Sequence, residues 1–315
     1  MLAIDIQHVS KRFGSFTAVD DLVLSVPAGC VQGFLGPNGA GKTTTLRMVM
    51  NIIAPDLGTI HVLGERMSEP IKKRIGYLPE ERGLYRKMRV LELLVFFASL
   101  KGLSEREGRQ RARDWLERFG LGDWAKRNVQ DLSKGMQQKV GFLATILHDP
   151  ELVILDEPFS GLDPVNLEFV RDVILDLKRR GRTVVFSTHQ MAEAEKLCDR
   201  IVMVLHGRKV LDGGLDEVRR GRDVVVVLEY RGDGAFLARD PEITRVNDYG
   251  HYSEISLRPD ADPSQLLRRL AERLQVLRFE LRQPTLHEIF VRTVRDGGGD
   301  VGMLVADSAS GGAAR

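Results

Sequence analysis

The chain has 315 residues, of which 43% are hydrophobic and 29% are charged. This balance is typical of a globular protein that buries one large core and a smaller second one. The formal net charge is only +2, and the longest apolar run, residues 91–100, is short and contains Glu92. We therefore expect no nucleic-acid partner, no transmembrane helix and no signal peptide.

Two alternating strands are predicted at the N-terminus, at residues 2–6 and 18–26. Phe13 lies between them, close in sequence to the glycine-rich loop that follows. An exposed aromatic side chain in this place would stack on a nucleobase, whereas an ordinary hydrophobic anchor would pack into the core. The sequence alone favours neither interpretation.

Residues 36–44 fit the phosphate-cradling pattern G-x-x-x-x-G-K-[ST], between a predicted buried strand at 31–35 and a predicted helix. The glycines let backbone N–H groups turn inward, and the helix N-terminus adds partial positive charge. We predict that Lys42 neutralises the β- and γ-phosphates and that the Thr43 hydroxyl ligates Mg²⁺. An ordinary glycine-rich turn is the alternative. The predicted nucleotide-binding residues here are Gly36, Pro37, Asn38, Gly39, Ala40, Gly41, Lys42, Thr43 and Thr44.

The periodicity becomes helical over residues 90–120. Charges of both signs alternate from residue 105 to residue 118, which is typical of a solvated helix face and not of a nucleic-acid patch. Ser133 is a good N-cap, and the apolar periodicity after it predicts a helix that continues to about Leu147.

Residues 151–158 predict a parallel strand that is buried on both faces, because the run at residues 152–155 is continuously apolar, and the strand ends in Asp156, Glu157 and a proline. Acids at the carboxyl end of such a strand lie where α/β sheets bind ligands. We predict that Asp156 holds Mg²⁺ and that Glu157 accepts a proton from the attacking water. Considered by itself, Glu157 could also be an acid at the start of a helix or an acid on the surface. His189, after the next predicted strand, would hydrogen-bond the γ-phosphate, although a lone histidine is more often structural.

After about residue 216 the pattern of the sequence changes, and a second set of strands and helices is predicted. Strands are predicted at residues 223–230, 252–257 and 276–281, with an amphipathic helix at 263–274. Thr285 and Glu288 form a capping box that opens a last helix. We predict a small α+β domain over residues 216–295 that carries no chemical motif, and a disordered tail at residues 296–315.

Taken in order, these motifs resemble the ATP-binding subunit of an ABC transporter over residues 1 to about 215. Residues 36–44 match the Walker A loop, residues 152–157 the Walker B strand and residues 160–163 the D-loop. His189 matches the switch histidine, and Phe13 matches the adenine-stacking aromatic. Residues 132–137, LSKGMQ, look like the signature that separates ABC ATPases from other P-loop proteins.

The resemblance implies an α/β P-loop NTPase fold, the ABC cassette, with a mixed β-sheet core and a helical subdomain at about residues 85–150. The small α+β domain follows it. In this family two cassettes dimerise head to tail, and each ATP lies between one subunit's Walker motifs and the other's signature. We therefore expect ATP and Mg²⁺ as ligands and a second ATP-binding subunit, in the simplest case another copy of this chain. The residues implied at that shared interface are Ser133, Gly135, Met136, Gln137 and Asp163.

Three positions depart from the usual family pattern. Lys134 stands at a signature position that is usually Gly, and Met136 where many members have Gln, a variation that occurs in exporter-type cassettes. Glu80 stands where the glutamine of the Q-loop is usual, and a glutamate there still suits Mg²⁺. Residues 77–85 and 284–290 resemble the sodium-exporter and drug-exporter ATPases that act with ABC-2 permeases.

The resemblance thus implies an ATP-hydrolysing exporter subunit on the cytoplasmic face of the membrane, beneath separate transmembrane permease subunits. A soluble ABC ATPase without a transport role is one alternative, but such proteins usually carry two cassettes or a long coiled-coil insertion. A regulatory cassette that only binds ATP is another. The presence of Lys42, Asp156, Glu157 and His189 disfavours it.

Overall fold

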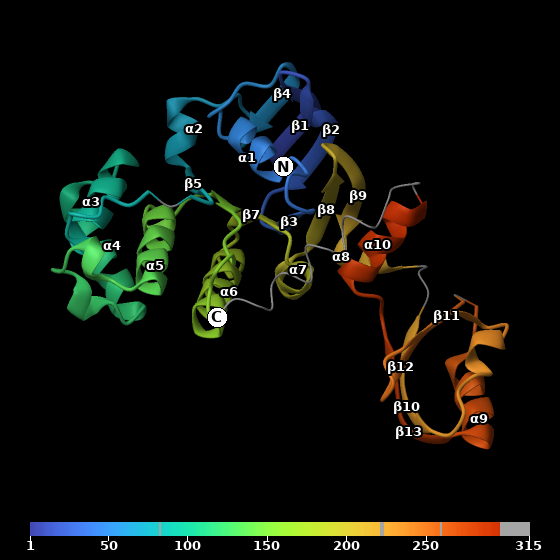
Figure 1. Ribbon diagram of the computed structural model, residues 1–315. Coiled ribbons are helices and arrows are strands. Elements are labelled where there is room, and N and C mark those ends of the chain that lie inside the picture. The colour runs from blue at the N-terminus through green and yellow to red at the C-terminus, as the bar shows by residue number, and fades with distance from the viewer. Residues whose placement is uncertain (82, 221–223, 259, 297–315) are drawn as a thin grey trace. The chain divides into compact units, whose positions relative to one another are not determined.

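The structure of the protein is a computed structural model that describes residues 1–81, 83–220, 224–258 and 260–296 (Figure 1). The described chain forms two compact units, Met1–Gly214 and a second unit that starts at Leu215. Residues 297–315, nearly all of the predicted disordered tail, lie outside the described residues.

A six-stranded sheet carries the first unit, with the strand order β5-β6-β7-β3-β8-β9. All pairs are parallel except the last, in which β9 runs antiparallel to β8. Every residue of β3, β6 and β7 is buried, which explains why apolar residues do not alternate with polar ones along these strands. The strands are β3 (Val31–Leu35), β5 (Ile75–Leu78), β6 (Leu152–Asp156), β7 (Thr183–Thr188), β8 (Arg200–Leu205) and β9 (Arg208–Gly214).

An antiparallel sheet with the order β2-β1-β4 completes the strands of this unit. It consists of β1 (Leu2–Phe13), β2 (Phe16–Pro27) and β4 (Leu57–Val62). The two N-terminal strands were predicted, but they are longer than their alternating segments. Side chains from both sheets share one core, in which Ile4 and Leu22 pack with Phe34 and Val202.

Helices α3, α4 and α5 pack together in the region predicted as the helical subdomain. The Ser104 hydroxyl caps α4 and the Ser133 hydroxyl caps α5, as predicted for Ser133. No helix in the described ranges is long and apolar enough to cross a membrane. The helices of this unit are α1 (Lys42–Val49), α2 (Glu69–Lys73), α3 (Val90–Leu100), α4 (Glu105–Arg118), α5 (Lys134–Ile146), α6 (Pro164–Arg179) and α7 (Met191–Leu197).

The second unit is an antiparallel sheet with the order β11-β12-β10-β13, accompanied by helices α8, α9 and α10. Leu266 and Leu270 of α9 pack against Val226 and Ile255 on one face of the sheet. The edge strand β11 was not predicted, because its residues are mostly polar and none is fully buried. The bounds are α8 (Leu215–Arg219), β10 (Val225–Arg231), β11 (Ile243–Asp248), β12 (Ser253–Leu257), α9 (Pro263–Arg273), β13 (Gln275–Arg282) and α10 (Leu286–Asp296).

The start of α10 is fixed by the predicted capping box. The Thr285 hydroxyl accepts a hydrogen bond from Glu288 N at 3.2 Å, and the Glu288 carboxylate accepts from Thr285 N at 2.7 Å. Arg282 of β13 donates to the same carboxylate at 2.7 and 2.8 Å, and to Glu254 of β12 at 2.9 Å. Burial raises the pKa of Glu288, but Arg282 and the Thr285 N–H outweigh it, and that pKa lies below its ordinary value. Arg282 therefore ties α10 to two strands of the sheet.

We predict that Arg282→Gln destabilises the second unit by about 1.5–3 kcal/mol at neutral pH, because two half-buried carboxylates lose a charged donor. Native-state hydrogen exchange of the β10 and β12 amides measures this loss. Arg278→Gln is the matched control, since Arg278 pairs with Glu229 and Glu280 at an exposed position and its loss is expected to have little effect.

The same pair predicts a pH dependence. Because the pKa of Glu288 is lowered in the folded state, its stabilising contribution is present above the ordinary glutamate pKa of 4.5 and is lost as the pH falls through the lowered value. The difference in the free energy of unfolding between the parent protein and Arg282→Gln should become smaller at acidic pH. A difference that stayed constant from pH 7 to below that value would contradict this account.

Candidate functional site

The glycine-rich loop of residues 36–44 joins β3 to α1, as predicted. Gly41 is the N-cap of α1 with a φ of 101°, and a Cβ atom there would lie 2.4 Å from the carbonyl oxygen of Ala18. Only glycine fits this position. A cavity of about 280 Å³ lies beside the loop, and Glu80 and Glu157 line it together with loop residues 38–44.

Lys42 is buried in this loop and is held by three oxygen atoms. Its Nζ donates to the carbonyl oxygens of Gly36 at 2.8 Å and Pro37 at 3.1 Å. It also lies 3.3 Å from Glu157 Oε1, as an ion pair between side chains that are 5% and 6% exposed. The two charges offset one another where water is largely excluded.

Asp156, at the end of β6, is fully buried and has one satisfied oxygen. Its Oδ1 accepts hydrogen bonds from the Thr43 hydroxyl at 3.0 Å and from the Ser187 hydroxyl at 2.6 Å. Its Oδ2 is buried without a hydrogen-bond partner among the described residues. Burial raises the pKa of Asp156, and the two hydroxyl donors offset this only in part. A buried carboxylate oxygen without a donor is costly, and a bound cation would remove that cost.

Glu157 follows in a left-handed backbone conformation with a φ of 47°, which is uncommon for a residue other than glycine. Its backbone N–H donates to the Ser187 hydroxyl at 2.9 Å, and its Oε2 lies 3.1 Å from His189 Nδ1. Burial raises the pKa of Glu157, but the contact with His189 and the charge of Lys42 outweigh it and leave that pKa below its ordinary value. Glu157 is therefore ionised at neutral pH, as a general base must be.

Comparisons with known proteins agree with this geometry. Residues 19–160 match the family model of the ABC transporter, and residues 213–294 match that of the ATP-binding protein DrrA1-3-like, C-terminal domain. The chain is 40% identical, over 93% of its length and 98% of the relative's, to the uncharacterized ABC transporter ATP-binding protein YhaQ of Bacillus subtilis (strain 168). It is 35% identical to the daunorubicin/doxorubicin resistance ATP-binding protein DrrA of Streptomyces peucetius, over 92% and 91% of the two chains.

This chain belongs to the ABC transporter ATP-binding proteins. It is an ATPase subunit of the exporter type, as the sequence motifs predicted. A solved structure of the ATP binding subunit of an ABC transporter confirms the fold of the cassette. That structure has 33% sequence identity and a TM-score of 0.65, over 70% of this chain and 92% of its own.

The ABC cassette brings the predicted Walker residues together with Glu80 and His189. Glu80 lines the cavity beside the loop and also a second cavity of about 460 Å³, where Gln137 and Glu157 are among its neighbours. Phe13 is 50% exposed and lines neither cavity, whereas Phe16, its register partner in the β1–β2 hairpin, lines the first. Adenine stacking by Phe13 stays a prediction, and Phe16 is a second candidate.

Asn166 of α6 lies between the predicted signature residue Gly135 and the predicted D-loop residue Asp163. Asp163 is exposed and caps α6 by accepting from Asn166 N at 2.9 Å, and the Asn166 side-chain amide donates to Asp163 at 2.5 Å. A Cβ atom on Gly135 would lie 2.4 Å from that amide nitrogen. Ser133 is exposed, with its hydroxyl 3.3 Å from Met136 N. The roles of these residues at a dimer interface stay predictions.

Ser187 is the site residue that the sequence reasoning missed. It lies directly opposite Asp156 in the pairing of β6 with β7, and it is fully buried. Its hydroxyl donates to the Asp156 carboxylate and accepts from the Glu157 backbone, so that one side chain holds both acids. A polar residue near the end of an apolar strand next to the Walker B strand was the available signal.

We predict that Ser187→Ala lowers kcat for ATP about 10- to 100-fold with a small change in KM. Losing a hydrogen bond to a charged group is worth about 1.5–3 kcal/mol, and the bond from the backbone N–H holds Glu157 in its left-handed conformation. Steady-state ATP hydrolysis separates the two constants. Ser187→Thr keeps the hydroxyl and should retain most of the activity.

Thr145→Val is the matched control, because it removes another buried hydroxyl, which donates to Gly141 O at 3.0 Å in α5. It should change stability without a comparable loss of turnover. Equal turnover losses in Ser187→Ala and Thr145→Val would contradict a specific role for Ser187.

Proposed function

We propose that this cassette hydrolyses ATP with Glu157 as the general base, at a site that a second cassette completes, and that it drives separate permease subunits in export. The observation that carries the proposal is the buried group of Lys42, Asp156 and Glu157 at the phosphate loop. Lys42 would exchange its loop carbonyl partners for the β- and γ-phosphates. Glu157, ionised and held by His189, would accept the proton of the attacking water.

We further propose that Thr43 and Asp156 hold Mg²⁺, with Glu80 nearby as a third ligand. The unpartnered Asp156 Oδ2 and the adjacent Thr43 hydroxyl are oxygen donors of the kind that Mg²⁺ prefers. When bound, Mg²⁺ neutralises charge on the β- and γ-phosphate oxygens. The described residues contain no group of three or more His, Cys, Asp and Glu that could hold a metal. ATP phosphates and water would therefore complete the ligand set.

The exposed N-terminus of α5 supports a composite site. Ser133 caps this 13-residue helix and is exposed, so that its free N–H groups and partial positive charge are available to the phosphates of an ATP on a partner cassette. Gly135, Met136 and Gln137 would follow on that surface, and Asp163 would contact the partner. We infer a homodimer as the simplest arrangement.

The second unit matches the C-terminal domain of DrrA1-3-like ATP-binding proteins. This match favours a role in transport over that of a soluble ABC ATPase without a permease. Relatives that align over 92% of this chain are named for linearmycin resistance in Bacillus subtilis and Nod factor export in Burkholderia lata. We place the protein on the cytoplasmic face of a membrane, bound to its permease, and leave the exported substrate unassigned.

The test of the composite site is the molar mass of Glu157→Gln, measured by size-exclusion chromatography with light scattering. We predict a monomer without nucleotide and a dimer with ATP and Mg²⁺, because ATP binds but is not cleaved. Ser133→Arg should abolish the shift by blocking the N-terminus of α5. Ser25→Arg, at an exposed position of β2, is the matched control and should leave it intact.

The composite site would be contradicted if the protein stayed a monomer under all conditions. These conditions include solubilising it together with membranes that contain its permease. A dimer that forms equally with Ser133→Arg would contradict the role of the signature helix.

A further inference from the structure

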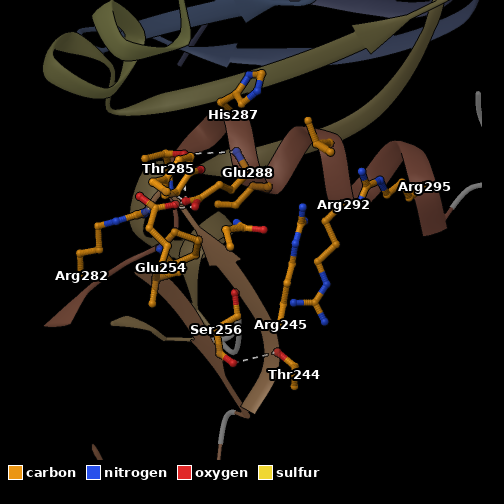
Figure 2. A pocket seen from close by; sticks show the side chains of 16 residues that line it. Thr244, Arg245, Glu254, Ser256, Arg282, Thr285, His287, Glu288, Arg292 and Arg295 are labelled. Atoms are coloured by element: carbon orange, nitrogen blue, oxygen red, sulfur yellow. Dashed lines mark hydrogen bonds and ion pairs between the residues drawn. The ribbon is translucent and has the colours of Figure 1, made fainter. Parts of the chain in front are cut away.

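The second unit contains a cavity of about 650 Å³ whose lining includes none of the predicted ATP-site residues. Figure 2 shows it between α10 and the strands of the β11-β12-β10-β13 sheet. The core around α9 uses the side chains of Val226 and Ile255, whereas their strand neighbours Val225, Glu254 and Ser256 line this cavity. The cavity therefore lies on the face of the sheet opposite α9.

The walls of the cavity carry an excess of positive charge. Four arginines, Arg245, Arg282, Arg292 and Arg295, line it against two carboxylates, Glu254 and Glu288, which leaves a surplus of two positive charges. Arg282 already binds both carboxylates, at 2.9 Å and at 2.7 and 2.8 Å. Both carboxylates of the cavity are therefore hydrogen-bonded to Arg282, the arginine that ties α10 to the sheet.

The other arginines come from two different elements. Arg245 lies on β11, whereas Arg292 and Arg295 lie on α10, and in Figure 2 Arg245 extends from its strand toward the helix while Arg292 extends from the helix toward the strands. Arg245 and Arg295 form no ion pair or side-chain hydrogen bond with another residue in the described part of the chain. Basic residues are common in the last turn of a helix, where they offset its dipole. That reason does not apply to Arg245, and like charges around one cavity repel each other unless an anion lies between them.

We propose that this cavity binds a ligand that carries a phosphate monoester. The surplus of two positive charges matches the charge of about −1.5 to −2 on such a group at neutral pH. A guanidinium group binds phosphate oxygens through two N–H groups at once, which suits arginines that line one cavity from a strand and a helix. Tyr249, which is exposed, and Val291, which is half-buried, give the rest of the ligand an apolar surface. The bound phosphate would bridge β11 and α10.

The test uses the full chain with its nucleotide site filled by ADP and Mg²⁺, so that the Walker loop does not compete for the probe. Glycerol 3-phosphate, measured by isothermal titration calorimetry, represents a free phosphate monoester. Phosphatidylcholine vesicles with and without phosphatidic acid, measured by co-sedimentation, present the same group as a lipid headgroup. We expect saturable binding in at least one arm.

Arg245→Gln/Arg295→Gln should weaken that binding about tenfold or more, because two charge-assisted contacts are lost. Arg245→Gln alone should weaken the binding as well. Because Arg245 is exposed, this single variant can be tested if the double variant unfolds. Arg268→Gln on α9 is the matched control, since it removes an exposed arginine on the other side of the sheet, and it should bind as the parent protein does.

Binding of glycerol 3-phosphate supports a soluble ligand, and binding of phosphatidic acid vesicles alone supports a lipid headgroup. Both outcomes support the proposal. No binding in either arm, or binding that the Arg245 and Arg295 variants leave unchanged, would overturn it. ATP hydrolysis by these variants should equal that of the parent protein, so a failure here is distinct from a failure of the proposed ATPase site.

Discussion

Two adjacent carboxylates lie at the end of one buried strand of this ABC ATPase, and the proposed chemistry depends on the different charges around them. Burial acts on both, yet the pKa of Asp156 is raised and that of Glu157 is lowered. The difference comes from their partners. Glu157 has the ammonium group of Lys42 and the ring of His189, whereas Asp156 has only neutral hydroxyl donors. The lowered pKa keeps Glu157 ionised at neutral pH, which suits the general base that we propose, and the open oxygen of Asp156 suits a cation that arrives with ATP.

The sheet fixes this arrangement. Pairing of β6 with β7 places Ser187 opposite Asp156, within hydrogen-bonding distance of both acids, and pairing of β3 with β7 places the phosphate loop beside them. The left-handed backbone at Glu157 turns the second acid toward Lys42 and His189 and away from the strand. The geometry of the base thus depends on one buried hydroxyl and on strand register.

The sequence predicted what local patterns encode. Continuous apolar runs located the buried parallel strands, and the capping box at Thr285 located the start of α10. Features that depend on pairing between distant segments were not predicted. Ser187 contacts both acids only because its register in the sheet places it opposite Asp156. The sequence of β11 is too polar to be recognised as a strand. The arginine-lined cavity is formed by residues of β11 and α10, which are far apart in the sequence. Phe16 similarly reaches the first cavity through the turn of a hairpin.

The most direct measurement of the central claim compares ATP turnover with ATP affinity in Glu157→Gln. If Glu157 is the general base, turnover should fall at least about 100-fold, while the affinity for ATP with Mg²⁺ stays within a few-fold of the parent value. Lys42 and the glycine-rich loop, which we propose bind the phosphates, are unchanged in this variant. Turnover that remained at the parent rate with normal affinity would contradict the account.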